Sequence, residues 1–163
     1  MKQEYKELLL KYLCMALPYG VKILHEGWNY EWDDELSTVE RVVGIDEKFI
    51  YTKVIDTHNG EEYREDSYSI DLFDDKPYLR PMSSMTDEEK DEMHNLLSPE
   101  GTAIYGCDGI SMPMNHYGEF VPYEFMIRII QYLLEHHFDF MGLIPKNLAI
   151  EVSEDNNPYE SNM

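Results

Sequence analysis

The stretch Lys76-Pro77-Tyr78-Leu79-Arg80-Pro81-Met82-Ser83-Ser84-Met85-Thr86-Asp87-Glu88-Glu89 separates a β-rich part of the chain from a helical part. Pro77 and Pro81 each disfavour the α conformation in the residue before them, so the first half of the stretch is predicted to be extended. Thr86 then begins a helix as its N-cap, and Glu89, three residues later, completes a capping box. The stretch therefore divides the predicted run of short strands from the predicted helices.

The residues before this stretch predict one helix and then several short strands. Apolar side chains recur at helical spacing over residues 3–17, and Pro18 ends the pattern. Residues 21–73 then contain short β-type runs, among which Asn59-Gly60 is the strongest hairpin signal. Apolar and polar side chains alternate over residues 68–73, which are expected to form the last of these strands.

The residues after the stretch predict a short polar helix, a long irregular segment and an apolar helix. The polar helix is expected over residues 86–97, and residues 98–121 show no periodic pattern. Residues 122–137 are mostly apolar and are expected to form a buried helix, and residues 148–152 predict a final strand. The repeating positions of the apolar helix, expected to be fully buried, are Phe125, Ile129 and Leu133.

Together these patterns predict an α+β protein. We expect an antiparallel sheet or small open β-barrel from residues 21–73, flanked by the N-terminal helix and the buried C-terminal helix. A length of 163 residues suits one domain with one core. We place this single domain at residues 1–152 and interpret residues 153–163 as a polar, frayed C-terminal tail.

The composition also predicts a compartment. No apolar run reaches the roughly 18 residues that a membrane span needs, and the N-terminus lacks a secretory signal pattern. The two cysteines are too few for a disulfide framework, and Cys14, in the first helix, is expected to be a buried thiol. The expected location is therefore the cytoplasm.

The chain is strongly acidic, with a formal net charge of −20. Residues 31–100 carry 21 acidic and 7 basic side chains. Such a field repels nucleic acid and anionic membranes and favours a basic protein surface as partner. The alternative is a solvated acidic surface that maintains solubility. Arg80 is one of the few cations in this region, and we expect it to have a structural carboxylate or carbonyl partner.

The candidate binding residues lie in an aromatic and acidic segment at positions 28–35. The segment has no clear hydrophobic period, so we interpret it as a loop or a hairpin tip. Aromatic side chains beside carboxylates supply both contact area and charge to an interface; the alternative is half-buried loop aromatics. The candidates are Trp28, Tyr30, Trp32, Asp33, Asp34 and Glu35.

Signals for catalysis, metals and cofactors are weak. The adjacent His136 and His137 do not share a helix face, so we predict no metal site and no cofactor. Cys107 and His116 are a nucleophile and a base only if the fold of residues 98–121 brings them together. A small metal- or cysteine-dependent hydrolase using this segment is therefore an alternative, and a non-enzymatic protein is favoured.

Three groups of residues carry a resemblance: LLLKYLC at 8–14 with LPYGV at 17–21, KPYLRPMSSMT at 76–86, and HHFDFMGLIPK at 136–146. They resemble an uncharacterised family of small acidic proteins from gut bacteria and their phages. The resemblance implies a phage or mobile-element setting and no particular activity. With the charge, it leads to the hypothesis of an acidic protein-interaction module. An alternative is an inhibitor whose carboxylates imitate nucleic-acid phosphates in the site of a host nucleic-acid-binding protein.

Overall fold

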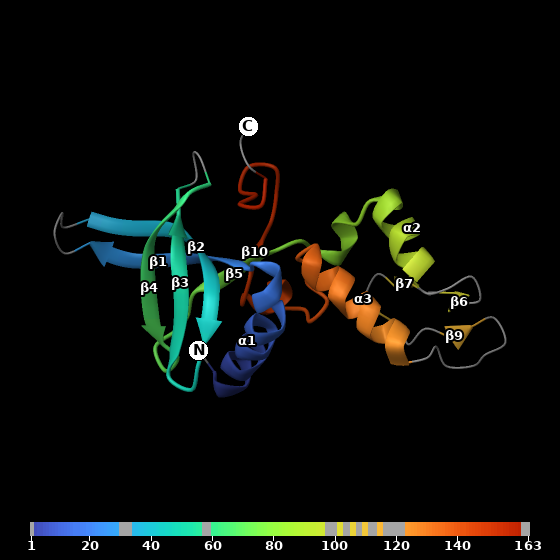
Figure 1. Ribbon diagram of the computed structural model, residues 1–163, viewed down its shortest axis with the longest axis horizontal. Helices are drawn as coiled ribbons and strands as arrows, with labels where there is room; N and C mark the ends of the chain where they lie inside the picture. Colours follow the sequence, from blue (N-terminus) through green and yellow to red (C-terminus); the bar gives the residue numbers. More distant parts are fainter. Residues whose placement is uncertain are drawn as a thin grey trace. The chain divides into compact units, whose positions relative to one another are not determined.

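A computed structural model describes residues 2–29, 34–56, 60–96, 101–102, 105–106, 109–110, 114–115 and 123–160 (Figure 1). The chain forms two compact units. The first unit contains residues 1–79 and 143–163, and the second contains residues 80–142. Compact units can still unfold together, so the single domain expected over residues 1–152 stays a prediction.

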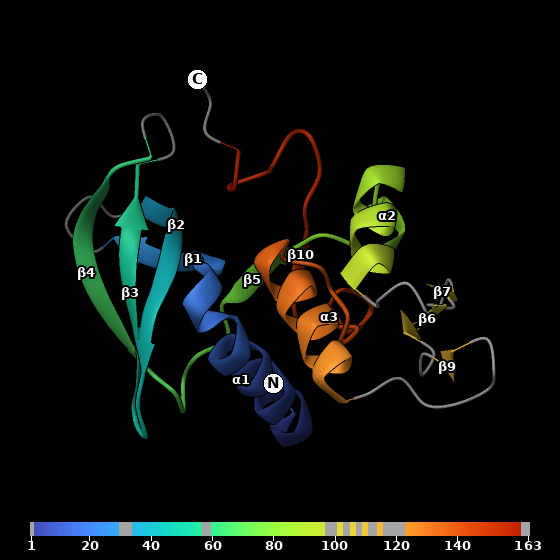
Figure 2. The ribbon, with the colours of Figure 1, turned by 45° about the vertical axis from the view of Figure 1, so that its right-hand side comes forward.

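The first unit is built on an open six-stranded sheet (Figures 1 and 2). The strands follow the order β10, β5, β1, β2, β3, β4, and neighbours are antiparallel except for β10 and β5. This confirms the α+β class and the antiparallel sheet, which is not closed into a barrel. The strands are β1 Lys22–Asn29, β2 Asp34–Ile45, β3 Phe49–Ile55, β4 Glu62–Ser69, β5 Lys76–Leu79 and β10 Ile150–Glu151.

Helix α1 (Gln3–Ala16) lies beside the sheet in both views and ends where the sequence predicts. A 3-10 turn over Leu17–Tyr19 follows, and Gly20 adopts a φ of 69°, a conformation that glycine tolerates best. Cys14 is exposed, so the expected burial of this thiol is wrong. At 100° per residue it falls on the far side of the helix from the buried positions. The core of the unit includes Leu9, Tyr12, Leu13, Ala16, Ile23, Val42, Ile50 and Val54.

The second unit contains α2 (Asp87–Leu96), α3 (Tyr123–Glu135) and two short ladders. The buried C-terminal helix is confirmed, and it packs against α2. Ile129 and Leu133 are buried as predicted, and the side chain of Phe125 lies outside the described residues. The ladders pair β6 (Gly101–Thr102) with β9 (Met114–Asn115) and β7 (Tyr105–Gly106) with β8 (Gly109–Ile110). No helix in the described part of the chain has the length and apolar content to cross a bilayer.

The stretch that opens the helical part has the predicted local structure. The Thr86 N–H donates to Glu89 Oε2 at 2.8 Å, and the Glu89 N–H donates to Thr86 Oγ1 at 3.2 Å. This confirms the capping box. Arg80 has the predicted carboxylate partner, because its guanidinium donates to both Glu89 oxygens, at 2.6 and 2.9 Å. The same guanidinium lies 4.3 Å from the centre of the Phe138 ring.

The strand expected over residues 68–73 ends early. The Ile70 N–H donates to Lys48 O at 2.8 Å, and the Leu72 N–H then donates to Ser69 O at 3.0 Å, which makes a turn. Leu72 is 83% exposed, so the apolar alternation that suggested a strand is not a buried face. The strand expected over these residues is wrong beyond Ser69, because the chain turns there.

The C-terminal residues up to 160 are attached to the sheet. The Lys22 N–H donates to the Tyr159 hydroxyl at 3.1 Å, and this hydroxyl donates to Tyr78 O at 3.0 Å. The Lys22 ammonium also donates to Pro158 O at 2.6 Å. The expectation of a frayed tail is wrong for these residues, because one aromatic side chain anchors an otherwise polar segment to β1 and β5.

Candidate functional site

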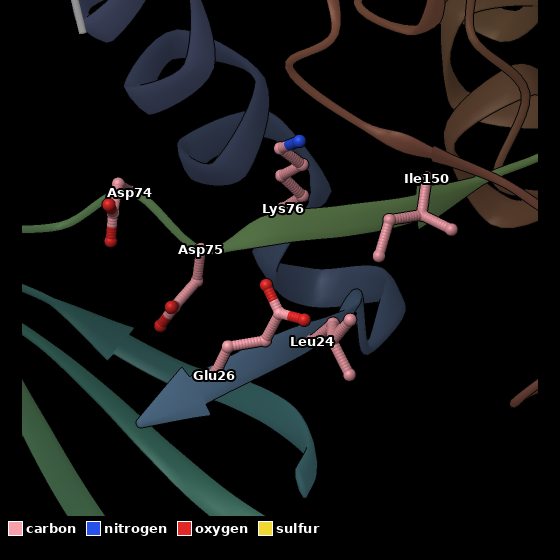
Figure 3. Close-up of a pocket in the computed structure, with 6 residues that line it drawn as sticks. All are labelled: Leu24, Glu26, Asp74, Asp75, Lys76 and Ile150. Atoms are coloured by element: carbon pink, nitrogen blue, oxygen red, sulfur yellow. The ribbon is translucent and has the colours of Figure 1, made fainter. Parts of the chain in front are cut away.

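A pocket of about 490 Å³ opens beside β1 and the beginning of β5 (Figure 3). Glu26 of β1 and Asp75, which precedes β5, direct their carboxylates toward the same side of β5, and Asp74 adds a third carboxylate. Lys76 projects from the opposite side of β5, and its ammonium donates to Asn147 Oδ1 at 3.0 Å. The lining residues are Leu24, Glu26, Asp74, Asp75, Lys76 and Ile150.

The pocket exists because β5 pairs with only a short part of β1. The paired residues are Ile23 with Pro77 and Leu24 with Lys76. Beyond this point β1 continues as far as Asn29, whereas the chain that leads into β5 approaches from another direction. The edge of β1 at Glu26 is therefore open on the side where the carboxylates gather.

Asp75 is the buried carboxylate of the pocket, with a side chain only 7% exposed. His25 Nδ1 lies 3.1 and 3.0 Å from its two oxygens. Burial raises the pKa of Asp75 to about 6, and the hydrogen bond from His25 opposes this rise. A second pocket, of about 280 Å³, lies on the side of His25, and Asp75 lines both pockets.

Glu40 is a second buried carboxylate and is fully inaccessible. It accepts hydrogen bonds from the hydroxyls of Thr38 at 2.8 Å, of Thr52, and of Tyr68 at 2.8 and 3.0 Å. The Tyr68 ring stacks on His25 with centroids 4.3 Å apart. Burial, followed by the hydrogen bond to Glu40, raises the pKa of the Tyr68 hydroxyl well above its ordinary value. The buried network therefore connects Glu40 to Asp75 through Tyr68 and His25.

Gly27, which has no side chain, leaves space for the His25 ring. A Cβ at position 27 would lie 2.9 Å from His25 Nε2, closer than a side chain tolerates without movement. Alternate residues of a strand share one face, so the imidazole lies over the glycine two positions further along β1. The glycine thus leaves room for the ring orientation in which Nδ1 meets Asp75.

The predicted binding segment falls at the end of the β1–β2 hairpin. Trp28 is paired with Glu35, and Asn29 with Asp34, across the two strands. Tyr30, Trp32 and Asp33 lie outside the described residues. The hairpin interpretation agrees with this pairing, and the role of the six candidates in binding stays a prediction.

The two adjacent histidines, His136 and His137, contact other residues of the second unit. The His136 ring stacks on Tyr132 with centroids 4.2 Å apart, and His136 Nδ1 lies 3.7 Å from Glu89 Oε1. His137 adopts a φ of 57°, and its carbonyl accepts a hydrogen bond from the Arg80 N–H at 2.8 Å. Among the described residues, no three His, Cys, Asp or Glu side chains are grouped as a metal site. Cys107 and His116 lie outside them, so the hydrolase alternative stays a hypothesis.

Sequence reasoning did not select His25, Glu26 or Glu40. A signal existed for Glu40, because it alternates with Thr38 and Val42 and so places a carboxylate on the inward face of a strand. His25 and Asp75 are fifty residues apart and carry no motif that links them. Their pairing follows only from the register of β5 on β1.

Comparison with known proteins identifies no relative. No protein-family model matches the chain, and neither curated proteins nor solved structures give a match. The resemblance to acidic phage-associated proteins therefore stays an expectation from the sequence. Any functional assignment rests on the chemistry of the pocket at β1 and β5 and of the network behind it.

Proposed function

We propose that this protein is a non-enzymatic interaction protein whose first unit binds a cationic group of a basic partner protein. The observation that carries the proposal is the pocket of about 490 Å³ that Glu26, Asp74 and Asp75 line. Lys76, the cation in its lining, is turned toward Asn147 and away from the carboxylates, of which Asp75 is paired with His25. Within the described residues, neither Glu26 nor Asp74 has a cationic partner. The pocket has room for a lysine or arginine side chain, and its charge is complementary to theirs.

The buried position of Asp75 gives a bound cation an energetic role. Desolvation disfavours the ionised carboxylate, as its raised pKa indicates. An opposite charge placed a few ångströms away favours the ionised form and offsets part of this cost. The net charge of −20 adds long-range attraction that accelerates encounter with a basic surface. Binding of this kind is expected to weaken as salt is added.

We infer a phage or mobile-element origin for this module from the resemblance of its motifs, with the basic partner supplied by the host cell. The cytoplasm is the proposed location, because a host protein of this kind is reached there. These statements extend the binding proposal and depend on it.

The proposal is tested by titrating the protein with a hexa-arginine peptide in a calorimeter, at low and at physiological salt. The pocket variant is Glu26→Gln with Asp74→Asn. The control variant, Glu47→Gln with Asp155→Asn, makes the same charge change at two exposed positions that do not line the pocket. We expect the pocket variant to lose at least tenfold in affinity and the control to lose less than threefold. Equal losses, or no binding by the unaltered protein, would contradict the proposal.

A further inference from the structure

We propose that the outer edge of β4 is a docking site for an extended, lysine- or arginine-bearing segment of the partner protein. The segment would add to the sheet as a seventh strand beside β4, the last strand in the sheet order. This inference rests on the proposed function in one respect, namely that the partner is basic. The edge lies outside the pocket of about 490 Å³ at β1 and β5, but it adjoins the pocket of about 280 Å³, which Ser67 and Ser69 line together with Asp74 and Asp75.

The register of β3 and β4 shows which backbone groups face outward. In an antiparallel pair, alternate residues direct both their N–H and their C=O toward the neighbouring strand. The Ile70 N–H donates to Lys48 O, and Ile50 is paired with Tyr68 in the same phase. The backbone N–H and C=O of Tyr68 therefore point toward β3. The backbone groups of the residues that alternate with it along β4 point away from β3. The outward residues are Glu65, Ser67 and Ser69, and no strand among the described residues lies beyond them. The carbonyl of Ser69 already accepts the Leu72 N–H, so the docking edge is centred on Glu65 and Ser67.

The side chains beside this edge suit an incoming strand. Ser69 is opposite Phe49, and Ser67 is opposite Tyr51, so each small serine shares a face of the sheet with an aromatic ring. Phe49 is 40% exposed and Tyr51 is 39% exposed. Side chains of a seventh strand would lie on the far side of the serines, within reach of the two rings. Lysine or arginine side chains there gain contact with the aromatic faces.

The charge of β4 selects a cationic occupant. Residues 61–66 include four carboxylates and a single cation, Arg64, whose Nε donates to Asp66 at 2.7 Å. From the neighbouring strands, Lys53 lies 3.6 Å from Glu62 and 3.5 Å from Glu65, and Arg41 also pairs with Glu62, so the remaining attraction for a cation is modest. The Glu65 side chain is 79% exposed. Two copies of this strand paired with each other would bring like charges together, a device by which edge strands avoid self-association. A second copy of the chain is therefore the disfavoured occupant, and a basic segment is the favoured one.

The test uses an acetylated and amidated eight-residue peptide of alternating lysine and valine, with a glutamate–valine peptide as its charge control. Ser67→Pro removes one outward N–H and no bond to β3, at an edge position where proline is tolerated. Ser67→Ala keeps the N–H and is the matched control. We expect the proline variant to bind the lysine peptide at least tenfold more weakly, the alanine variant to bind within twofold of the unaltered protein, and the glutamate peptide not to bind.

A second measurement leaves the protein unchanged. The bound lysine peptide should slow amide hydrogen exchange at Glu65 and Ser67, and N-methylation of the peptide along one edge should abolish binding. If the proline variant binds the lysine peptide fully and amide exchange at Glu65 and Ser67 is unchanged, the docking edge is overturned. If only the Glu26→Gln and Asp74→Asn variant loses affinity, the proposal for the pocket stands and the one for the edge does not. Failure of both basic peptides to bind would remove both proposals. If the unaltered protein dimerises and Ser67→Pro abolishes the dimer, the occupant of the edge is a second copy of the chain, and the inference is overturned.

Discussion

Arg80 binds the same carboxylate that closes the capping box of α2. Its guanidinium donates to Glu89 Oε1 and Oε2, and Oε2 also accepts the N–H of Thr86. The backbone of Arg80 is used as well, because its N–H donates to His137 O and its carbonyl accepts the Asp139 N–H, each at 2.8 Å. One residue thus fixes the beginning of α2 and the chain that follows α3 in the second unit.

We expect Glu89→Ala to destabilise the second unit by about 2–3 kcal/mol, because it removes a cap and leaves a charged donor without its partner. Glu89→Gln keeps an acceptor for the Thr86 N–H and should cost roughly 1 kcal/mol less. The pKa of Glu89 is lowered, first by the Arg80 hydrogen bond. Its stabilising contribution is therefore complete above the ordinary glutamate pKa and is lost as the pH falls below it. Urea melts followed by circular dichroism measure both effects; equal losses in the two variants would argue against the cap.

The substitution Leu133→Ala tests the core and the domain organisation together. Leu133 is fully buried, so the change should cost about 2–5 kcal/mol through lost transfer energy and a cavity. Both tryptophans, Trp28 and Trp32, belong to the first unit. If residues 1–152 unfold as one domain, tryptophan fluorescence and helical circular dichroism should shift to lower urea by the same amount. A shift in circular dichroism alone would divide the chain into two domains.

A third prediction concerns the pH dependence of stability. The pKa of Asp75 is raised to about 6, so between its ordinary value and this one the folded chain binds more protons than the unfolded chain. Stability should therefore fall as the pH rises through this window. In Asp75→Asn the fall should be smaller by about 1–2 kcal/mol, after allowance for solvent screening. The neighbouring Asp74→Asn is the control and should keep most of the slope. An unchanged slope in Asp75→Asn would show that Asp75 is not the group that titrates.

The predicted binding segment has its own test. Replacing Asp33, Asp34 and Glu35 by Asn, Asn and Gln should leave the melting temperature unchanged and slow the association of the hexa-arginine peptide, most clearly at low salt. Stopped-flow association rates at two salt concentrations measure this. The exposed pair Glu47→Gln with Asp155→Asn is again the control. If the triple variant associates with the peptide at the same rate as the control variant, residues 28–35 are not part of the binding surface.

Local signals predicted much of the fold. The capping box of Thr86 and Glu89, the helix ending before Pro18 and the buried Leu133 depend on residues close in sequence or on helical spacing, and all three are confirmed. The register of β5 on β1 depends instead on contacts between distant segments. The sequence did not predict that His25 would meet Asp75, because neither residue carries a local pattern that requires the other. Tyr159 was missed for the same reason.

Segments that precede and follow the second unit in the sequence meet in one sheet, and this orders the events of synthesis. β1 comes from the first thirty residues and β10 from residues 150–151, while the whole second unit is encoded between β5 and β10. A chain leaving the ribosome therefore has every residue of the second unit available before β10 exists. Until then β5 lacks its outer neighbour and exposes an unpaired edge. The nascent chain is thus expected to be most vulnerable to aggregation and proteolysis at this edge during the interval between the synthesis of β5 and that of β10.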